Sequence, residues 1–238
     1  MTADTAVVIP AKNEGERIAA TVETALALPG VDLVVVVDDG STDRTGKYAR
    51  EAGAKVVRHS RNRGKAAAME TGAESVRLFD GDVPRHLLFL DADLGHTAAA
   101  AAALIEPVRQ GRADMTVAVF STLVKLGGHG IVVRLARDGI KRATGFEAVQ
   151  PLNGQRCLTR AAFEAARPLA YGFGVETGLT IDLLRKGFRV SEVEVEMSHR
   201  ATGSDLRSQL HRAGQLRDVA LALALREPFV RDTLGVRR

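Results

Sequence analysis

Short runs of β-branched residues alternate with helical segments through the first half of this chain, and this alternation constrains the fold more than any other feature. The predicted strands are residues 6–9, 31–37, 55–58, 87–90 and 115–120. The predicted helices are residues 14–28, 42–52, 64–76 and 97–110. This order predicts an α/β fold whose mostly parallel sheet carries helices on both faces. In such sheets ligands bind beyond the carboxyl ends of the strands.

The second half of the chain is less regular. A glycine-rich loop is expected at residues 121–130, and the remaining elements are predicted strands at 156–159 and 189–196 and predicted helices at 131–143, 175–186 and 204–225. The helix at 131–143 is amphipathic and basic. Its pattern fits either a packed helix with a solvated basic face or a surface helix that meets lipid phosphates.

Charge is concentrated at one end of the chain. The 238 residues include 33 Lys and Arg and 29 Asp and Glu, a net charge of +4. Residues 200–238 hold 8 Arg and 4 acidic residues, so they account for the whole net charge. A neutral body with a basic tail argues against nucleic acid as a partner, since such binding needs a basic folded face. The tail instead favours a local anionic partner, such as a phosphate or a membrane surface.

Composition also indicates the cellular compartment in which the protein works. Cys157 is the only cysteine, which excludes an intrachain disulfide and makes a small core residue the better interpretation of its thiol. The first residues lack the pattern of a signal peptide, and no apolar stretch approaches the roughly 20 residues of a membrane span. We expect a cytoplasmic protein, with peripheral contact at the inner membrane face left open.

Two polar clusters follow the first two predicted strands. Residues 10–14 read Pro-Ala-Lys-Asn-Glu, and residues 38–43 read Asp-Asp-Gly-Ser-Thr-Asp. Adjacent carboxylates repel, so holding Asp38 and Asp39 together is costly without a partner. One of them could accept hydrogen bonds from a ribose or a base edge. The alternative is a helix cap followed by acids that the helix dipole favours.

Two more clusters follow the next strands. Residues 61–65 read Arg-Asn-Arg-Gly-Lys at a predicted helix N-terminus, where free N–H groups and Lys65 suit a phosphate. Asp91 and Asp93 leave an apolar strand two residues apart. A carboxylate pair of this kind suits a divalent cation that also binds substrate phosphates. The alternatives are a solvated basic loop and a helix cap with one surface acid. Taken together, the four clusters predict a nucleotide-diphosphate site.

These residues resemble the GT-A glycosyltransferases, family 2 in particular. The matching segments are VVIPAKNEG, VVVVDDGSTDRT, NRGKAAAM and LFLDADLG, in order within residues 6–95. The resemblance implies a GT-A, Rossmann-like fold and a nucleoside diphosphate sugar donor, with a UDP-sugar such as UDP-glucose preferred. It implies that the base and ribose lie against Pro10, Ala11, Glu14, Asp39 and Ser41. Gly64 and Lys65 would lie near the nucleotide, and Asp91 and Asp93 would form the D-x-D motif that holds the donor through Mg²⁺ or Mn²⁺.

The second half resembles a narrower group, the retaining glucosyl-3-phosphoglycerate synthases and their shorter bacterial relatives. The matching segments are QPLNGQRCLTR, YGFGVETGLTIDLLRKGFRV and MSHRATG. The resemblance implies that His199 completes the metal site with Asp93. Inverting relatives place an acidic base in the region of Glu176, which makes Glu176 a candidate catalytic residue with Asp91 and Asp93; the alternative is a structural role at a helix N-terminus, where the dipole favours an acid. Glu176 would be a base in an inverting enzyme and would position sugar hydroxyls in a retaining one. The acceptor side would include Gly154, Gln155 and Arg200.

One departure concerns the acceptor. The group holds the phosphate and carboxylate of its acceptor with an Arg and a Thr, and Gly130 and Val132 stand at the matching positions here. A small hydroxy or phosphorylated compound and a polyprenyl phosphate therefore both stay open as acceptors. Two other classes of function remain as alternatives, a sugar-nucleotide pyrophosphorylase and a non-catalytic nucleotide-sugar-binding module. Residues 7–15 argue against the pyrophosphorylase, because they lack its glycine-rich signature.

The predicted organisation has three parts. Residues 1–120 form the half that binds the nucleotide sugar, residues 121–203 form the acceptor-side half of the same domain, and residues 204–238 form a helix and basic tail. Arg207, Arg212 and Arg217 would begin beside the diphosphate, whereas Arg226 could touch a membrane or a second subunit of a homodimer, or be solvated. The remaining histidines are predicted to be surface or loop residues: His59, His86, His96, His129 and His211.

Overall fold

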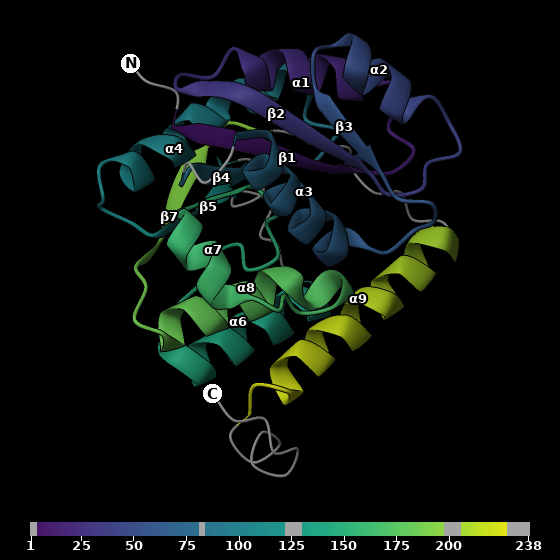
Figure 1. Ribbon diagram of the computed structural model, residues 1–238. Coiled ribbons are helices and arrows are strands. Elements are labelled where there is room, and N and C mark those ends of the chain that lie inside the picture. The colour runs from purple at the N-terminus through teal and green to yellow at the C-terminus, as the bar shows by residue number, and fades with distance from the viewer. Residues whose placement is uncertain (1–3, 81–83, 122–129, 198–205, 228–238) are drawn as a thin grey trace.

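The computed structural model describes residues 4–80, 84–121, 130–197 and 206–227, with side chains of the last range described from residue 213. Within these ranges seven strands form one sheet in the order β3-β2-β1-β4-β6-β5-β7 (Figure 1). The strands are β1 (Thr5–Ala11), β2 (Val31–Asp38), β3 (Lys55–Arg58), β4 (His86–Phe89), β5 (Met115–Phe120), β6 (Arg156–Leu158) and β7 (Val190–Val195).

The pairing is mostly parallel, as the strand–helix alternation predicts. β1 lies between β2 and β4 and pairs in parallel with both, β3 extends this set beside β2, and β5 pairs in parallel with β7. β6 is the exception, since it runs antiparallel to both β4 and β5. This reversed strand carries the residues just before it, including Gln155, to the carboxyl ends of the parallel strands. The predicted α/β fold class is confirmed.

The helices lie near their predicted positions with some differences at the ends. They are α1 (Ile18–Leu26), α2 (Thr45–Glu51), α3 (Lys65–Asp80), α4 (Ala102–Arg109), α6 (Ile131–Thr144), α7 (Arg160–Ala166), α8 (Val175–Arg185) and α9 (Leu206–Ala224). The first helix begins later than predicted because Glu14–Arg17 forms a turn before it. The short 3₁₀ segments are η1 (Gly95–Ala101) and η2 (Gly172–Gly174). α7 was not predicted, and the hydroxyl of Thr159 caps it by accepting from the amide of Ala162.

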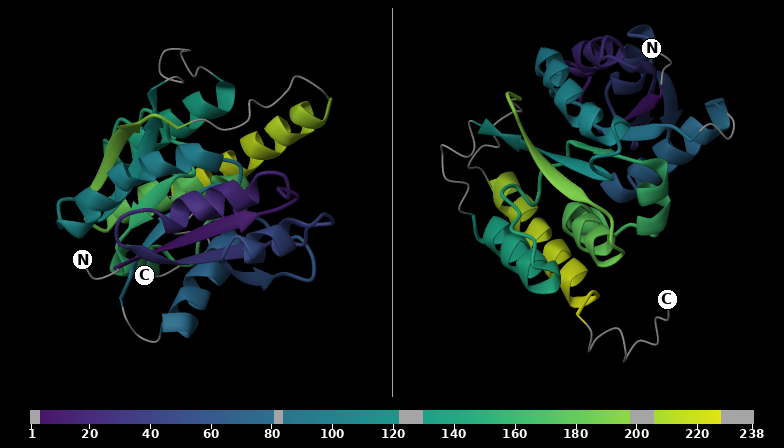
Figure 2. Two further views of the ribbon diagram at one scale, coloured as in Figure 1. Left: turned by 90° about the horizontal axis from the view of Figure 1, so that it is seen from above. Right: turned by 90° about the vertical axis from the view of Figure 1, so that its left-hand side faces the viewer.

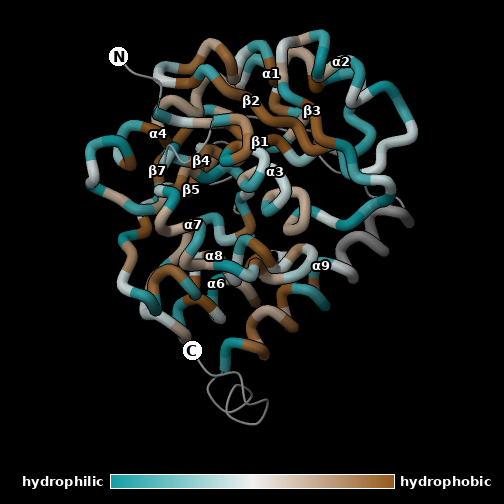
Figure 3. The backbone as a smooth tube through the Cα atoms, in the orientation of Figure 1, coloured by the Kyte–Doolittle hydropathy of each residue, from teal (hydrophilic) through white to brown (hydrophobic). Residues whose placement is uncertain are grey.

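Two hydrophobic cores cover the two faces of the sheet. Successive side chains of a strand point to opposite faces, so Val7 and Ile9 of β1 belong to the core beneath α1, α2 and α4. Ala6 and Val8 belong to the core beneath α3, α7 and α8. The apolar strands run through the centre in the hydropathy view of Figure 3, with the more polar helices outside them.

α6 and α9 form an outer pair that packs against α8 (Figure 2, right). Their closest approach is at Gly139, where a Cβ atom would lie 2.4 Å from Cδ2 of Leu223. Ala136 and Ile140, on the same face of α6, are buried. The apolar face of this amphipathic helix is therefore used for packing, which matches the first of its two predicted interpretations. Among the described residues no helix is long and apolar enough to cross a membrane.

Candidate functional site

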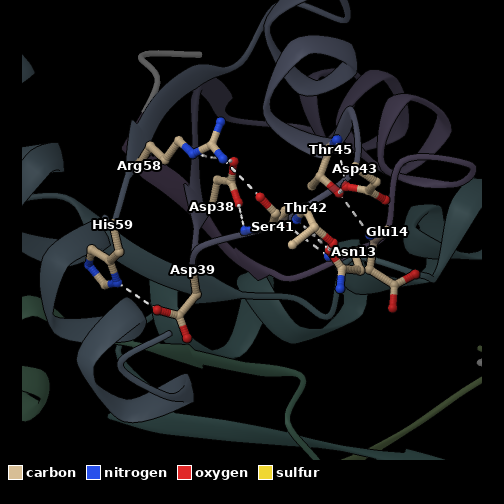
Figure 4. A network of polar contacts seen from close by, with 10 residues as sticks. All are labelled: Asn13, Glu14, Asp38, Asp39, Ser41, Thr42, Asp43, Thr45, Arg58 and His59. Atoms are coloured by element: carbon tan, nitrogen blue, oxygen red, sulfur yellow. Dashed lines mark hydrogen bonds and ion pairs between the residues drawn. The ribbon is translucent and has the colours of Figure 1, made fainter. Parts of the chain in front are cut away.

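The loops after β1 and β2 are tied to each other by side chains (Figure 4). Asn13 adopts a left-handed backbone conformation with φ of 56°. Its amide donates to Oγ of Ser41 at 3.0 Å, and its Oδ1 accepts from the amide of Thr42 at 2.8 Å. The amide of Glu14 donates to Oγ1 of Thr45 at 2.8 Å. The sequence therefore builds one rigid wall from the predicted contacts Pro10, Ala11, Glu14 and Ser41.

The two adjacent aspartates of β2 have different roles. Asp38 is fully buried, and its Oδ1 accepts from the amide of Ser41 at 2.8 Å. Its Oδ2 forms an ion pair with Nε of Arg58 at 3.6 Å. Gly46 lies so close that a Cβ there would be 2.8 Å from this oxygen. Asp38 therefore supports the turn, which corresponds to the structural alternative for the pair, and Asp39 is the aspartate next to the predicted nucleotide residues.

Asp39 is held by three N–H groups. Its Oδ1 accepts from the amide of Arg63 at 2.8 Å and lies 2.7 Å from Nδ1 of His59, and its Oδ2 accepts from the amide of Gly64 at 2.8 Å. Gly64 adopts a positive φ of 88°, a conformation that favours glycine. His59 lies in the loop after β3, one of the two predicted alternatives, but it is not at the surface, because its side chain is 5% exposed. The burial of His59 depends on Asp39, which follows the adjacent strand β2, and this neighbour cannot be identified from the local sequence.

Lys65, at the N-terminus of α3, joins the two halves of the chain. Its Nζ lies 2.9 Å from Oδ1 of Asp91 and 2.9 Å from Oε1 of Glu176. Burial disfavours its ammonium, but attraction to Asp91 and then to Glu176, with hydrogen bonds to both, outweighs this cost and raises the pKa of Lys65. Lys65 therefore stays charged near neutral pH, and two carboxylates from distant parts of the sequence share it.

Gly154 and Gln155 lie against the same cluster. Nε2 of Gln155 donates to Oδ2 of Asp91 at 2.8 Å, so both carboxylate oxygens of Asp91 are engaged. Oε1 of Gln155 is buried and has no hydrogen-bond partner within the described part of the chain. A Cβ at residue 154 would lie 2.3 Å from Nζ of Lys65 and 3.1 Å from Oδ1 of Asp91. Glycine at 154 is what allows this approach.

Arg156 is a further site residue that the sequence reasoning did not identify. It is 1% exposed, and its guanidinium donates to the carbonyls of Pro151, Asn153 and Glu176 and to Oγ1 of Thr180. Burial lowers the pKa of Arg156 to about 10, an effect that Glu176 and Glu192 partly offset. The arginine thereby fastens the 150–155 loop to the helix that carries Glu176. The available signal was an arginine inside a short apolar strand.

The loop after β4 carries the D-x-D residues. Oγ1 of Thr21 donates to the carbonyl of Ala92 at 2.9 Å and accepts from the amide of Gly95 at 2.8 Å, which fixes the loop around Asp93 to α1. Asp93 is half-buried. His199 and Arg200, the other predicted metal and acceptor residues, lie outside the described residues. Within the described ranges no group of three His, Cys, Asp or Glu side chains could hold a metal ion.

The C-terminal helix fixes the segment in front of Glu176. Oδ2 of Asp218 accepts from the amide of Phe173 at 3.2 Å. A Cβ at Gly172 would lie 2.0 Å from the same oxygen. Arg217 donates to Oδ1 of Asp218 at 2.9 Å and Arg226 forms an ion pair with Asp182. Both arginines therefore have partners within the chain, and their predicted contacts with a diphosphate, a membrane or a second subunit stay predictions.

Comparisons with known proteins identify a family for the chain. The family model described as "Glycosyl transferase family 2" matches residues 6–126. The glycosyltransferase AglJ of Haloferax volcanii is 31% identical over 206 residues, which cover 84% of this chain and 64% of that protein. The glucosyl-3-phosphoglycerate synthase of Mycolicibacterium smegmatis is 32% identical over 193 residues, covering 74% of this chain and 62% of the relative. The chain thus spans less than two thirds of the length of these curated relatives.

A solved structure gives a likeness over more of the chain. The crystal structure of glucosyl-3-phosphoglycerate synthase from Mycobacterium tuberculosis, in complex with Mn²⁺, UDP and phosphoglyceric acid, superposes with a TM-score of 0.75 at 26% identity. The match covers 93% of this chain and 78% of that chain. The predicted GT-A arrangement of the sheet is therefore confirmed, and the matched part of the chain includes both halves that meet at Lys65.

Proposed function

Since the chain belongs to glycosyl transferase family 2, we propose that this glycosyltransferase moves a sugar from a UDP-sugar, such as UDP-glucose, to an acceptor that carries a hydroxyl or phosphate group. The observation that carries the proposal is the Lys65 cluster, in which Asp91 from the first half meets Glu176 and Gln155 from the second. This cluster lies where the carboxyl ends of parallel strands meet, which is where α/β sheets bind ligands.

The proposed donor site follows the wall formed after β1 and β2. The uracil and ribose lie against Pro10, Ala11, Glu14, Ser41 and Asp39. The amide of Glu14, the hydroxyl of Ser41 and the carboxylate of Asp39 are already engaged in hydrogen bonds. A preorganised wall lowers the cost of ordering that binding would otherwise carry. Support for UDP-glucose comes from a structure of the Mycobacterium tuberculosis synthase with Mn²⁺, UDP-glucose and phosphoglyceric acid, 28% identical to this chain.

Lys65 and Gly64 are the proposed contacts nearest the diphosphate. The lysine charge is balanced by Asp91 and Glu176 before a donor binds. Glu176 is 9% exposed as a side chain and accepts from Lys65, so its carboxylate is held in one orientation. We assign to it the positioning of sugar hydroxyls, because a carboxylate fixed by an ammonium is a directed acceptor of hydrogen bonds.

A divalent cation fits the donor set of this site. Following the predicted ligands, we assign the metal to Asp93 together with His199, while Asp91 is hydrogen-bonded to Lys65 and Gln155. A carboxylate oxygen with an imidazole suits Mn²⁺ as well as Mg²⁺. When bound, the cation would neutralise the negative charge that develops on the leaving diphosphate.

The acceptor side is assigned to Gly154, Gln155 and Arg200. Gln155 holds the carboxylate of Asp91 beside this side of the site, and Gly154 keeps the approach to Lys65 open. Gly130 and Val132 provide no charged side chain for a phosphorylated acid. The acceptor is therefore one whose binding does not depend on those two positions, either a small hydroxy compound or a polyprenyl phosphate.

The test is release of UDP from a panel of UDP-sugars with Mn²⁺ and candidate acceptors. We expect release with at least one donor, its loss when EDTA removes the metal, and its loss in Asp93→Ala. Lys47→Ala, on the exposed face of α2, is the matched control and should keep full activity. Binding of UDP-sugars without release under any condition would instead indicate a nucleotide-sugar-binding module. Co-sedimentation with anionic vesicles separates the two acceptor classes, since a lipid acceptor requires it.

A further inference from the structure

The carboxylate of Asp39 is nearly saturated by donors from the protein. An aspartate accepts about two hydrogen bonds at each oxygen. Oδ1 receives two, from Nδ1 of His59 and the amide of Arg63, and Oδ2 receives one, from the amide of Gly64. One acceptor position therefore remains on Oδ2, and the Asp39 side chain keeps 7% of its surface exposed. The group can receive a single further donor from a ligand.

His59 controls the orientation of this carboxylate (Figure 4). It follows β3, and its other ring nitrogen, Nε2, lies 3.0 Å from Oγ1 of Thr71 on α3. A carboxylate cannot donate, so Nδ1 carries the proton that joins His59 to Asp39. Nε2 and the hydroxyl of Thr71 form the second hydrogen bond of the ring. The ring is held at both ends, and so is the carboxylate that it contacts.

We propose that His59 is a positioning residue for nucleotide recognition: it holds Asp39 so that the remaining acceptor position on Oδ2 meets an N–H of the donor's base. This inference rests on the proposed donor site. Uracil presents an N–H at position 3 of its ring, whereas cytosine presents a lone pair there. A fixed acceptor-only group therefore favours UDP over CDP, because cytosine leaves the carboxylate facing another acceptor.

A structural brace for residues 59–65 is the competing explanation, and base preference separates the two. A loosened loop weakens the contacts to the diphosphate, which UDP and CDP share, so both nucleotides lose affinity alike. If the carboxylate of Asp39 is turned away from the base, only the affinity for UDP falls. The ratio of the two affinities therefore reports on the orientation of Asp39 rather than on the stability of the loop.

The experiment measures binding of UDP and CDP, with Mn²⁺, to the full chain and to three variants by calorimetry. His59→Leu removes the donor. His59→Asn restores it, since the side-chain amide nitrogen of Asn stands at the same position beyond Cγ as Nδ1 of His. His86→Leu is the matched control, because His86 begins β4 at the amino end of the parallel strands. Thermal unfolding of each variant is recorded alongside.

We expect His59→Leu to weaken UDP binding about tenfold, the factor that corresponds to a hydrogen bond of about 1.4 kcal/mol, and to leave CDP binding nearly unchanged. His59→Asn should stay within about twofold of the parent for both nucleotides, as should His86→Leu. The inference is overturned if folded His59→Leu keeps the parental preference, or if Asn and Leu lose it equally. If the parent binds neither nucleotide, the proposed donor itself fails, which is a separate and recognisable result.

Discussion

Replacing Lys65 with methionine keeps the length of the side chain and removes the charge that Asp91 and Glu176 share. At an effective dielectric constant of about 20, each 2.9 Å contact represents roughly 6 kcal/mol of attraction before desolvation. Desolvation of the three groups offsets most of this in the native protein. Without Lys65, the two carboxylates remain close to one another with no cation between them, so they repel each other. This repulsion determines how much the free energy of unfolding falls.

The expected loss follows from how buried the three side chains are. Lys65 is 27% exposed, Asp91 31% and Glu176 9%. Removing one partner of a fully buried pair costs about 3–5 kcal/mol. Water reaches the Asp91 contact, so we expect Lys65→Met to lower the free energy of unfolding by about 2–3 kcal/mol. Adding Glu176→Gln should recover about 1 kcal/mol, because it removes one of the two facing charges.

Urea unfolding at pH 7 measures these changes. The pKa of Lys65 is raised above its ordinary 10.5, so its stabilising contribution is complete below pH 10.5 and is lost only as the pH rises through the higher folded value. The assay at pH 7 therefore reads the full contribution. Lys47→Met is the control, since Lys47 and Glu51 are each 58% exposed and their contact is worth under about 1 kcal/mol. A loss below about 1 kcal/mol in Lys65→Met, or a double variant less stable than Lys65→Met alone, would refute this reasoning.

Three further predictions concern neighbouring residues. Gly154→Ala places a methyl group 2.3 Å from Nζ of Lys65, so steady-state kinetics should show kcat/KM at least about tenfold lower, and an unchanged value would contradict the close approach. Arg156→Met leaves several buried carbonyls without a donor and should lower the free energy of urea unfolding by about 3–5 kcal/mol, with a loss under 1 kcal/mol as the opposing result. Burial, with a smaller effect of Asp4, raises the pKa of the Cys157 thiol above its ordinary 9.0, so the thiol ionises only in the unfolded chain. From pH 9 to 10 the parent should therefore lose about 1 kcal/mol more stability than Cys157→Ala, and parallel pH profiles would count against this.

Much of the donor side could be predicted from the sequence because its residues follow parallel strands. The alternation of apolar runs and helices gives the direction of β1, β2 and β4, and the carboxyl ends of these strands must meet at one edge. Asp39 and Asp91 follow two of these strands, so the sequence alone predicts that they lie at the same edge of the sheet. Lys65 begins the helix that returns across the same sheet.

The role of each side chain within a cluster was harder to predict from the sequence. The pair Asp38 and Asp39 looks equivalent in sequence, yet one is buried beneath the turn and the other is held by His59 and Gly64. Which aspartate faces inward depends on where β3 and the following loop come to lie. Local periodicity carries no information about that neighbour, and for the same reason the burial of His59 could not be predicted from the sequence.

The pattern of apolar runs and helices was enough to predict the α/β class, the parallel pairing of most strands and the edge at which the nucleotide residues gather. Only the tertiary structure decided that β6 runs antiparallel between β4 and β5. That reversal brings Gln155 to Asp91, and the packing of α8 brings Glu176 to Lys65. The physical reason is that strand direction and helix docking in the second half are set by contacts between segments far apart in the chain, which a local pattern of apolar and polar residues does not encode.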